Sequence, residues 1–404
     1  MRRVVVTGLG VVSSIGIGKD EFWKNLIKGK SGISKIESFD TSSYSTQYGG
    51  EIGSFQPENF INKHKIDLLG RASQLSIAAS KLAVQDSGLE LNEIKNNNTG
   101  VFVGTTMGET QLMEEIDTTW IEKGQESVKF SSISLYPSSN ISANVALEFK
   151  AKGDNFVMPT ACAAGNYSIG YGFDVIRRSA KTDIVLVGGA DAFSKVAYTG
   201  FNRLYVMSPD KCRPFDKNRK GMMIGEGASI LVLESLESAL KRKATIYAEV
   251  LGYGLSCDAF HMTHPTEEGI SKCMQKAMKE AGIDISDVDY ISAHGTGTPQ
   301  NDKIEVAAIK KVFGKRYKKL PVSSIKSMLG HTMGAAAAIE AAVCCLSLKE
   351  GILPATINYE TPDSECDIDC VPNEARKVEI KVALNNSYAF GGNDACLALK
   401  KYDD

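Results

Sequence analysis

The sequence predicts an α/β protein in which one strand–helix pattern occurs twice, folded as a duplicated five-layer α-β-α-β-α sandwich. Three observations predict it. Short β-branched runs alternate with helix-like segments, which is typical of a mostly parallel, buried sheet. A second set of such runs follows the first. Each set also contains one helix built almost entirely of small and apolar residues, and a helix without a polar face is buried.

The predicted strands of the first set are residues 4–7, 100–104, 155–158, 183–188 and 229–233. The opening run follows a basic start and superficially imitates a signal peptide. Gly8, Gly10, Gly16 and Gly18 interrupt it, and no small-residue cleavage site follows. We therefore interpret this run as a strand followed by a loop.

The predicted strands of the second set are residues 245–253, 289–293, 320–324, 381–386 and 395–400. The two buried helices are predicted at 163–178 and 333–349. No low-complexity linker separates the sets, which indicates intimate packing rather than a flexible tether. We divide the chain into an N-terminal half, residues 1–245, and a C-terminal half, residues 246–404.

Composition excludes several classes of protein. The net charge is -2 over 404 residues, so a nucleic-acid binder with a strongly basic surface is not expected. The nine cysteines are an odd number, which favours reduced thiols in the cytoplasm over a disulfide framework. The longest apolar stretch, 335–348, contains Glu340 and is too short to span a bilayer, so no membrane segment is predicted.

A cysteine lies at the predicted junction between a strand and the first buried helix. Cys162 is surrounded by small residues in the run PTACAAG, which permits a sharp turn. A thiol at the N-terminal end of a helix is favoured as thiolate by the helix dipole. Free cysteines are commonly buried structural residues, however, so this motif alone supports a structural and a catalytic role equally.

Two of the five histidines occur in unusual settings. His294 follows a predicted strand and opens HGTGTP, where glycines let the backbone approach a ligand. His331 ends SSIKSMLGH, immediately before the second buried helix. Each histidine alone is as readily explained by a structural role. Placed at equivalent strand-to-helix points of a duplicated fold, both are expected to meet Cys162 in one cavity.

The combination of one thiol and two histidines selects among reaction types. A cysteine hydrolase needs one histidine and a carboxylate or amide that orients it. Carbon–carbon bond formation by decarboxylation instead produces an enolate, whose oxygen is stabilised by N–H donors from two neutral imidazoles. A thioester on Cys162 would hold the electrophile beside that enolate.

Four motifs together resemble those of the β-ketoacyl-[acyl carrier protein] synthase II family. They read PTACAAG around Cys162, HGTGTP from His294, KSMLGH from Lys326 to His331, and NSYAFGGN around Phe390. The resemblance covers about residues 2 to 400. It implies the thiolase fold, an acyltransferase with no bound cofactor or metal, and substrates carried on the phosphopantetheine of acyl carrier protein. It also implies a homodimer, or a heterodimer with a chain-length-factor-like subunit.

The resemblance also implies catalytic roles. Cys162 would be the acylated nucleophile, and His294 with His331 would drive decarboxylation and stabilise the enolate. Lys326 would support His331 through Glu340, unless it is a solvated surface lysine. The backbone N–H groups of Cys162 and of Phe390, the gate residue, would form the oxyanion hole.

The resemblance further implies that several residues bind substrate. Thr296 and Thr298 would bind the pantetheine amides, or would merely cap a turn. Met107 would line the acyl tunnel, unless it is core filler, and Leu135 would reach the tunnel across the dimer. Two gating loops are expected at 387–393 and 256–265, with substrate-facing residues Gly391, Gly392, Asp258 and Thr263.

Departures from the family pattern concern the gate and the carrier. Tyr388 and Ala389 replace the usual Phe and Gly, and Asn393 with Asp394 replaces Thr-Asn. The family usually offers a pair of basic residues to the carrier protein. At that pair this chain has other residues, and its basic residues lie only at shifted positions nearby. Candidate carrier-binding residues are Lys63, Lys65, Arg71, Arg203, Lys211, Arg213 and Arg219.

Other enzyme classes fit less well. A non-decarboxylating thiolase would need a second cysteine in a Cys-x-Gly setting, whereas Cys396 is followed by Leu-Ala. A dinucleotide-binding fingerprint fails because Ser13 stands where glycine is required. The pairs His261/His264 and Cys366/Cys370 lack a second ligand pair at metal-binding spacing. Fatty-acid elongation and polyketide-type synthesis, including a ketosynthase subunit of a heterodimer, both remain compatible with the motifs.

Overall fold

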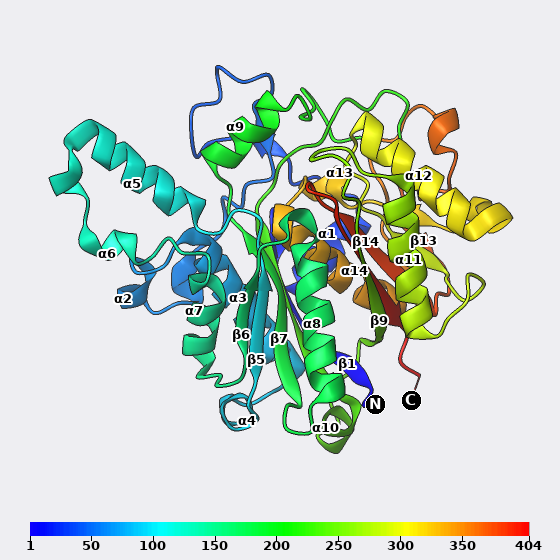
Figure 1. The fold of residues 1–404 in the computed structure, drawn as a ribbon, viewed down its shortest axis with the longest axis horizontal. Helices are drawn as coiled ribbons and strands as arrows, with labels where there is room; N and C mark the ends of the chain where they lie inside the picture. The colour runs from blue at the N-terminus through cyan, green and yellow to red at the C-terminus, as the bar shows by residue number, and fades with distance from the viewer. Residues whose placement is uncertain (404) are drawn as a thin grey trace.

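A computed structural model of the chain describes residues 1–403 (Figure 1). Its main strands form two units with the same order and directions. The first unit has the order β6-β5-β7-β8-β1 and the second β11-β10-β14-β15-β9. The strands of the first are β1 (Val4–Ser13), β5 (Gly100–Gly104), β6 (Asn155–Met158), β7 (Ile184–Asp191) and β8 (Gly227–Ser235). Those of the second are β9 (Ala248–Cys257), β10 (Tyr290–Ser292), β11 (Val322–Ser323), β14 (Val382–Tyr388) and β15 (Asn393–Lys400).

Strand directions repeat as well. β5 runs parallel to β6 and β7, while β8 is antiparallel to β7 and β1. In the same way β10 runs parallel to β11 and β14, while β15 is antiparallel to β14 and β9. Antiparallel pairing of Val4–Val6 with Ala248–Val250 joins the two units at one edge. The predicted duplication is therefore confirmed, and the division of the chain at residue 245 stays a prediction.

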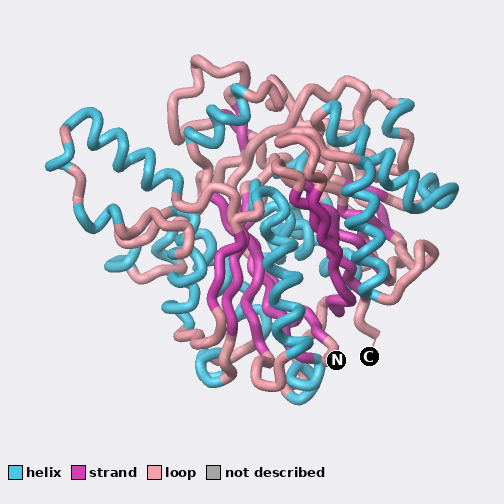
Figure 2. The backbone as a smooth tube through the Cα atoms, viewed as in Figure 1, coloured by secondary structure: helices cyan, strands magenta, loops and turns pink. Residues whose placement is uncertain are grey.

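Helices form the remaining layers, with the strands between them (Figure 2). The central layer contains α8 (Ala164–Arg178) and α14 (Ala336–Glu350), which contact strands of both units and each other. α3 (Arg71–Ser87) and α7 (Asn140–Phe149) cover the outer face of the first unit. α11 (Glu267–Ala281) and α12 (Pro299–Phe313) cover that of the second. This is the predicted five-layer arrangement.

Smaller elements connect these layers. The helices are α1 (Lys19–Ile27), α2 (Lys63–Ile66), α4 (Leu91–Asn96), α5 (Thr110–Lys123), α6 (Phe130–Ile133), α9 (Lys195–Arg203), α10 (Leu236–Lys241) and α13 (Lys326–Leu329). Short strands are β2 (Gly16–Ile17), which pairs with β1, β3 (Ser34–Lys35) with β4 (Tyr48–Gly49), and β12 (Ile352–Leu353) with β13 (Arg376–Lys377). Single turns η3 (Ala161–Ala163) and η5 (Met333–Ala335) precede the two central helices. No helix within residues 1–403 is long and apolar enough to cross a membrane.

The first strand is longer than predicted because its glycines do not break it. β1 continues through Gly8 and Gly10 to Ser13. A Cβ on Gly10 would lie 1.9 Å from the carbonyl oxygen of Ala79, and one on Gly8 would lie 2.2 Å from that of Ala83. These glycines therefore let α3 pack directly on the strand.

The two central helices differ in burial. Every residue of α14 from Ala336 to Leu348 is buried, as predicted for a helix without a polar face. α8 buries only part of its surface, and Tyr171 on the other side is exposed next to β6, where it stacks edge-on against Phe156. The prediction of all-round burial is therefore wrong for α8.

A close contact and a set of amide hydrogen bonds fix the crossing of α8 and α14. A Cβ on Gly165 would lie 2.6 Å from the backbone nitrogen of Ala338. Asn385 of β14 donates to Asn166 of α8 at 2.9 Å and to the carbonyl of Ala337 of α14 at 2.8 Å. Asn166 donates in return to the carbonyl of Asn385 at 3.0 Å. Both helices and one strand thus share a single buried polar junction.

We expect Gly165→Ala to destabilise the protein, because the added methyl group would overlap the backbone of α14. Overpacking of this kind costs about 1–3 kcal/mol, so the apparent Tm measured by circular dichroism should fall by several degrees. The matched control is Gly200→Ala in α9, where a Cβ meets nothing within 4 Å. Alanine in an exposed helix is favoured by about 1 kcal/mol, so that variant should match or exceed the wild type. Equal Tm values for the two variants would contradict the crossing.

Candidate active site

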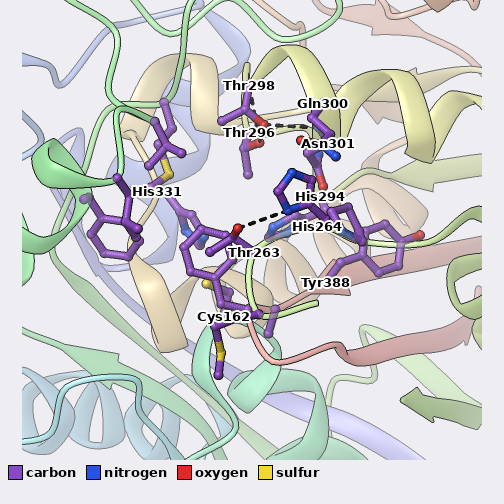
Figure 3. A pocket seen from close by; sticks show the side chains of 18 of the residues that line it. Cys162, Thr263, His264, His294, Thr296, Thr298, Gln300, Asn301, His331 and Tyr388 are labelled. Atoms are coloured by element: carbon purple, nitrogen blue, oxygen red, sulfur yellow. Dashed lines mark hydrogen bonds between the residues drawn. The ribbon is translucent and has the colours of Figure 1, made fainter. Parts of the chain in front are cut away.

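One cavity of about 350 Å³ brings together Cys162, His294 and His331, which lie far apart in the sequence (Figure 3). Cys162 comes from η3 before α8, His294 from the end of β10, and His331 from the loop between α13 and η5. All three side chains are almost fully buried. The cavity therefore forms where the N-terminal ends of both central helices meet the end of a strand.

The nucleophile candidate follows a strained residue. Ala161, directly before Cys162, has φ +49°, and Met333, at the matching point before α14, has φ +52°. The positive φ turns the chain sharply from strand to helix, and alanine keeps side-chain bulk away from the thiol. The hydroxyl of Ser387 donates to the carbonyl of Cys162 at 2.8 Å and ties this turn to the end of β14.

The thiol is less acidic than the sequence indicated. Burial raises the pKa of Cys162 to about 12, although the positive charge of Lys326 acts in the opposite sense. The sequence-based prediction considered only the N-terminus of the helix, which favours thiolate. The thiol is 6% exposed, so desolvation of the charged form outweighs that effect and the resting group is a neutral thiol.

His331 is held as one neutral tautomer. Its ring Nδ1 accepts a hydrogen bond from the backbone N–H of Met333 at 3.2 Å, so the ring proton lies on Nε2. Its own backbone N–H donates to the carbonyl of Met223 at 2.6 Å. Burial and then the charge of Lys326 hold the pKa of His331 well below its ordinary value. The imidazole therefore offers an N–H donor and no charge.

His294 is positioned through its backbone by a buried carboxylate. Glu305 of α12 accepts from the N–H of His294 at 2.9 Å and from that of Gly295 at 2.8 Å. Burial, Lys326 and His331, in that order, lower the pKa of His294 well below its ordinary value. The two imidazole rings lie 5.3 Å apart at 83°, and the ring of Tyr388 lies 5.6 Å from His294.

Lys326 and Glu340 form a buried ion pair close behind the histidines. Each side chain is 1% exposed, and the lysine Nζ donates to Glu340 Oε1. Burial raises the pKa of Glu340 to about 7 against the opposing charge of Lys326. Neither residue lines the cavity. Lys326 is therefore not a solvated surface lysine, and its charge acts on the cavity from within the core.

Several of the predicted substrate-binding and gate residues line the entrance of the cavity. Thr263, Thr296, Thr298, Phe390 and Gly392 line the cavity. Figure 3 shows both threonines of the HGTGTP motif, Thr296 and Thr298, on the upper side of the view and Cys162 on the lower side. Thr298 also caps α12 by accepting from the N–H of Asn301 at 3.3 Å, so lining and capping are combined in one residue.

The remaining predicted substrate residues lie outside this cavity. Asp258 and Gly391 flank the entrance without lining it. Met107 packs against an apolar cluster that Phe390 also contacts, and it lines a second depression together with Tyr136. Leu135 is half-buried and lines neither space. The role proposed for Leu135 requires a second chain, so the tunnel roles of Met107 and Leu135 stay predictions.

Three of the candidate carrier-binding arginines are engaged internally. Arg71 pairs with buried Glu226 at 2.6 Å. Arg213 pairs with Asp210 and with Glu360, each at 2.9 Å. Arg219 is buried and pairs with Asp363. The prediction of an exposed basic patch is therefore wrong for Arg219, whereas Arg71 and Arg213 stay partly exposed and their role in carrier binding stays a prediction.

Sequence reasoning missed several residues of the site. Glu305 and Asp302 are buried acids one turn apart on the apolar face of α12, and that pattern was the available signal. Apolar and aromatic residues of the entrance gave no signal, because their sequence environment is ordinary. They include Phe201, Leu204, Tyr205, Met222 and Met262. Within residues 1–403 no group of three or more His, Cys, Asp or Glu side chains is arranged to hold a metal ion.

Comparison with known proteins gives consistent matches over the whole chain. Residues 1–239 match the family described as Beta-ketoacyl synthase, N-terminal domain, and residues 247–360 match Beta-ketoacyl synthase, C-terminal domain. The chain is 42% identical to 3-oxoacyl-[acyl-carrier-protein] synthase 2 of Staphylococcus aureus (strain COL), with 100% of this chain and 99% of that protein covered.

Two solved structures are similar over their full lengths. The ishigamide ketosynthase/chain length factor superposes with a TM-score of 0.97 at 44% identity, with 100% of both chains covered. A type II PKS acyl-carrier protein in complex with its ketosynthase bound to the hexaketide gives a TM-score of 0.92 at 35% identity, again with 100% of both covered. The fold is therefore that of the thiolase-type ketosynthases, as predicted.

We expect Lys326→Met to raise the pKa of both His294 and His331, because a positive charge that disfavours the imidazolium is removed. Both should stay below the ordinary histidine value, since burial is the larger cause. Nuclear magnetic resonance of ¹³C-labelled histidine can resolve this, because the chain has only five histidines. The exposed residue Lys349 provides the matched control, Lys349→Met. Unchanged titration in Lys326→Met would contradict the electrostatic role of Lys326.

Proposed function

Because this chain belongs to the β-ketoacyl synthase family, we propose that it joins a malonyl unit to an enzyme-bound acyl group. The reaction is a decarboxylative Claisen condensation that yields a β-ketoacyl-[acyl carrier protein]. The observation that carries this proposal is the meeting of one thiol and two neutral imidazoles in a single buried cavity. Fatty-acid elongation and polyketide-type synthesis both use this reaction.

Acyl transfer is the first step and uses Cys162. The thiol sulfur attacks the carbonyl carbon of an acyl thioester carried on phosphopantetheine. The carbon–sulfur bond to the carrier then breaks, and the thiol proton passes to the departing carrier thiolate. We assign the backbone N–H groups of Cys162 and Phe390 to the intermediate oxyanion. The hydroxyl of Ser387, three residues before Phe390, donates to the carbonyl of Cys162 and ties the end of β14 to this turn.

Decarboxylation is the second step and uses the histidines. Loss of carbon dioxide from the malonyl thioester leaves an enolate, whose oxygen accepts hydrogen bonds from His331 Nε2–H and from the N–H of His294. The low pKa of both rings matters here, because an imidazolium would pair with the malonyl carboxylate and stabilise the ground state. Neutral donors stabilise the charge only after it moves to the enolate oxygen.

Condensation is the third step and regenerates the thiol. The enolate carbon attacks the acyl carbonyl on Cys162, and the carbon–sulfur bond to the enzyme breaks. The product stays on the carrier, and the released Cys162 thiolate takes one proton from solvent. The burial that raises the pKa of this thiol favours that protonation. Each turnover therefore consumes one proton, and no resident cofactor or metal is required.

We propose that a second chain completes the molecule along β6. This strand ends the sheet, so one of its edges is unpaired within residues 1–403. Phe156 on β6 is 48% exposed and stacks on Phe102. An open edge with an exposed aromatic residue is typical of a strand that pairs with another chain. The partner would be a second copy, or a chain-length-factor-like subunit as in the ketosynthase/chain length factor of similar structure.

We propose that acyl carrier protein docks at the cavity entrance. Lys220 lines the cavity, and Arg203 and Lys211 are exposed close to its lining residues in the chain. The arginines of the same stretch, Arg213 and Arg219, are by contrast already paired with acidic side chains. Phosphopantetheine carries a phosphate, and a lysine or arginine at the rim would pair with it. Exposed Tyr205 and Met262 add apolar surface beside these cations.

We expect incubation with an acyl carrier protein thioester to add the acyl mass to Cys162, and Cys162→Ala to abolish the adduct. Peptide mapping by mass spectrometry locates it. The matched control is Cys257→Ala, because Cys257 is an exposed cysteine whose removal should leave acylation intact. An adduct on any other cysteine would refute the assignment of the nucleophile.

We expect His331→Ala to retain acyl transfer to Cys162 and to lose decarboxylation, because the imidazole acts on the enolate rather than on the thiol. Loss of one such donor lowers the rate by about 100-fold to 1000-fold. Carbon dioxide release from malonyl carrier protein and acylation of Cys162 should be measured in parallel. The exposed residue His64 provides the control His64→Ala, which should behave as wild type. Condensation by His331→Ala at a normal rate would overturn this division of roles.

A further inference from the structure

Two backbone hydrogen bonds join the loops on either side of the cavity entrance. The N–H of Gly391 donates to the carbonyl of Met262 at 2.8 Å, and the N–H of Asp258 donates to the carbonyl of Gly392 at 3.0 Å. We call this pair of bonds the entrance clasp. Gly392 has φ +77°, and a Cβ there would lie 2.8 Å from the Cβ of Asp258. The gate loop that carries Phe390 therefore moves away from the other loop only if the clasp breaks.

Two carboxyl groups lie directly beneath the clasp. Asp258 accepts from the N–H of Thr266 at 3.0 Å, at the N-terminus of α11. Asp394, the second residue of β15, is 1% exposed. A Cβ on Gly269 would lie 1.9 Å from an oxygen of Asp258 and 3.0 Å from an oxygen of Asp394. The two carboxyl groups therefore approach each other closely, and two ionised groups at that distance repel strongly.

The surroundings of Asp394 do not compensate a second negative charge. One oxygen accepts from Ser256 at 3.4 Å, and no group within residues 1–403 hydrogen-bonds the other. The titratable groups that face Asp394 are Asp258 beside the clasp, Cys273 of α11, Tyr167 of α8 and Tyr388 of β14. The nearby cation, Lys276, is exposed and donates to the carbonyl of Leu255.

Asp394 is accordingly neutral in the closed arrangement at pH 7. Burial, and then the charge of Asp258, raise the pKa of Asp394 to about 8. The family usually has asparagine at this position, and a protonated carboxyl has the same shape and no charge. Aspartate differs from asparagine in one respect, because it loses a proton to solvent as the pH rises.

We infer that Asp394 is a positioning residue that keeps the entrance clasp closed while protonated and releases the gate loop when it ionises. The inference rests on the proposed function in one respect, namely its consequence. If the chain is a condensing enzyme, carrier-bound substrates enter the cavity more readily as the pH rises. The direction of the pH effect follows from thermodynamic linkage. The closed state favours the protonated form of Asp394, so the closed state is most stable at low pH. The opening equilibrium rises by up to about tenfold per pH unit between the ordinary aspartate pKa and the raised one, and then levels off.

Amide hydrogen exchange tests the inference directly, because the two clasp donors are the amides of Gly391 and Asp258. Exchange of the substrate-free protein is followed from pH 6 to pH 9 and corrected for intrinsic exchange rates. Between pH 6 and pH 8 the wild-type protection of both amides should fall by at least about fivefold. In Asp394→Asn it should change by less than about twofold. Amides of β5 provide an internal reference that should not respond in either protein.

Two further variants separate this role from a general loss of structure. Asp258→Asn keeps an acceptor for Thr266 and removes the repelling charge, so the pH response should become smaller. Asp289→Asn is the matched control, because Asp289 also accepts backbone N–H groups but lies at the start of β10, away from the gate, and should respond as wild type. Wild-type protection that is independent of pH, or an equal fall in Asp394→Asn, would overturn the inference.

The same samples distinguish failure of the inference from failure of the proposed function. Exchange requires no substrate, whereas acylation of Cys162 is measured separately at pH 6 and pH 8. If the wild type is never acylated, the proposed function fails while the exchange result stands. If acylation occurs but exchange of the clasp amides does not depend on pH, the proposed acyl transfer is supported and the role of Asp394 is rejected.

Discussion

The close crossing of α8 and α14 between the two strand units is the constraint on which the site depends. Gly165 allows the helices to approach, and Asn385 bonds both of them to β14. The crossing fixes the N-terminal ends of two helices from different halves of the chain at one place. Since Cys162 and His331 stand just before those ends, their relative position is set by the core and not by a flexible loop.

Burial and one internal cation then determine the chemistry of the cavity. Burial disfavours every charged form, so the thiol and both imidazoles are neutral at rest. Lys326 pairs with Glu340 and still acts on both histidines. A site of this kind stabilises charge where it develops during the reaction instead of holding it in advance, which is what a decarboxylation followed by carbon–carbon bond formation requires.

The departures from the family pattern gather at one point of the structure. Tyr388 and Asp394 face each other in register across β14 and β15, and Asp394 lies against Asp258 of the entrance. The substitutions noticed in the sequence as separate differences are therefore one structural feature of the gate. Tyr388 lines the cavity that contains Cys162, whereas Asp394 and Asp258 lie outside it, so this feature connects the entrance to the site.

The sequence by itself determined the alternation of strands and helices, the duplication, and the placement of Cys162, His294 and His331 at strand-to-helix junctions. Periodicity and turn chemistry are local, and a repeated local pattern implies a repeated topology. Only the tertiary structure decided which charges are buried. Arg219 reads as part of an exposed basic run but pairs with Asp363 inside the protein. Glu305, whose only local signal was an acidic side chain on the apolar face of α12, accepts from the backbone N–H of His294. In the sequence Gly8 and Gly10 indicate breaks in a strand. In the structure they lie within the strand, and their lack of a side chain lets α3 pack closely against it. Each of these depends on a partner distant in the chain, and local sequence carries no information about which distant residue will be adjacent after folding.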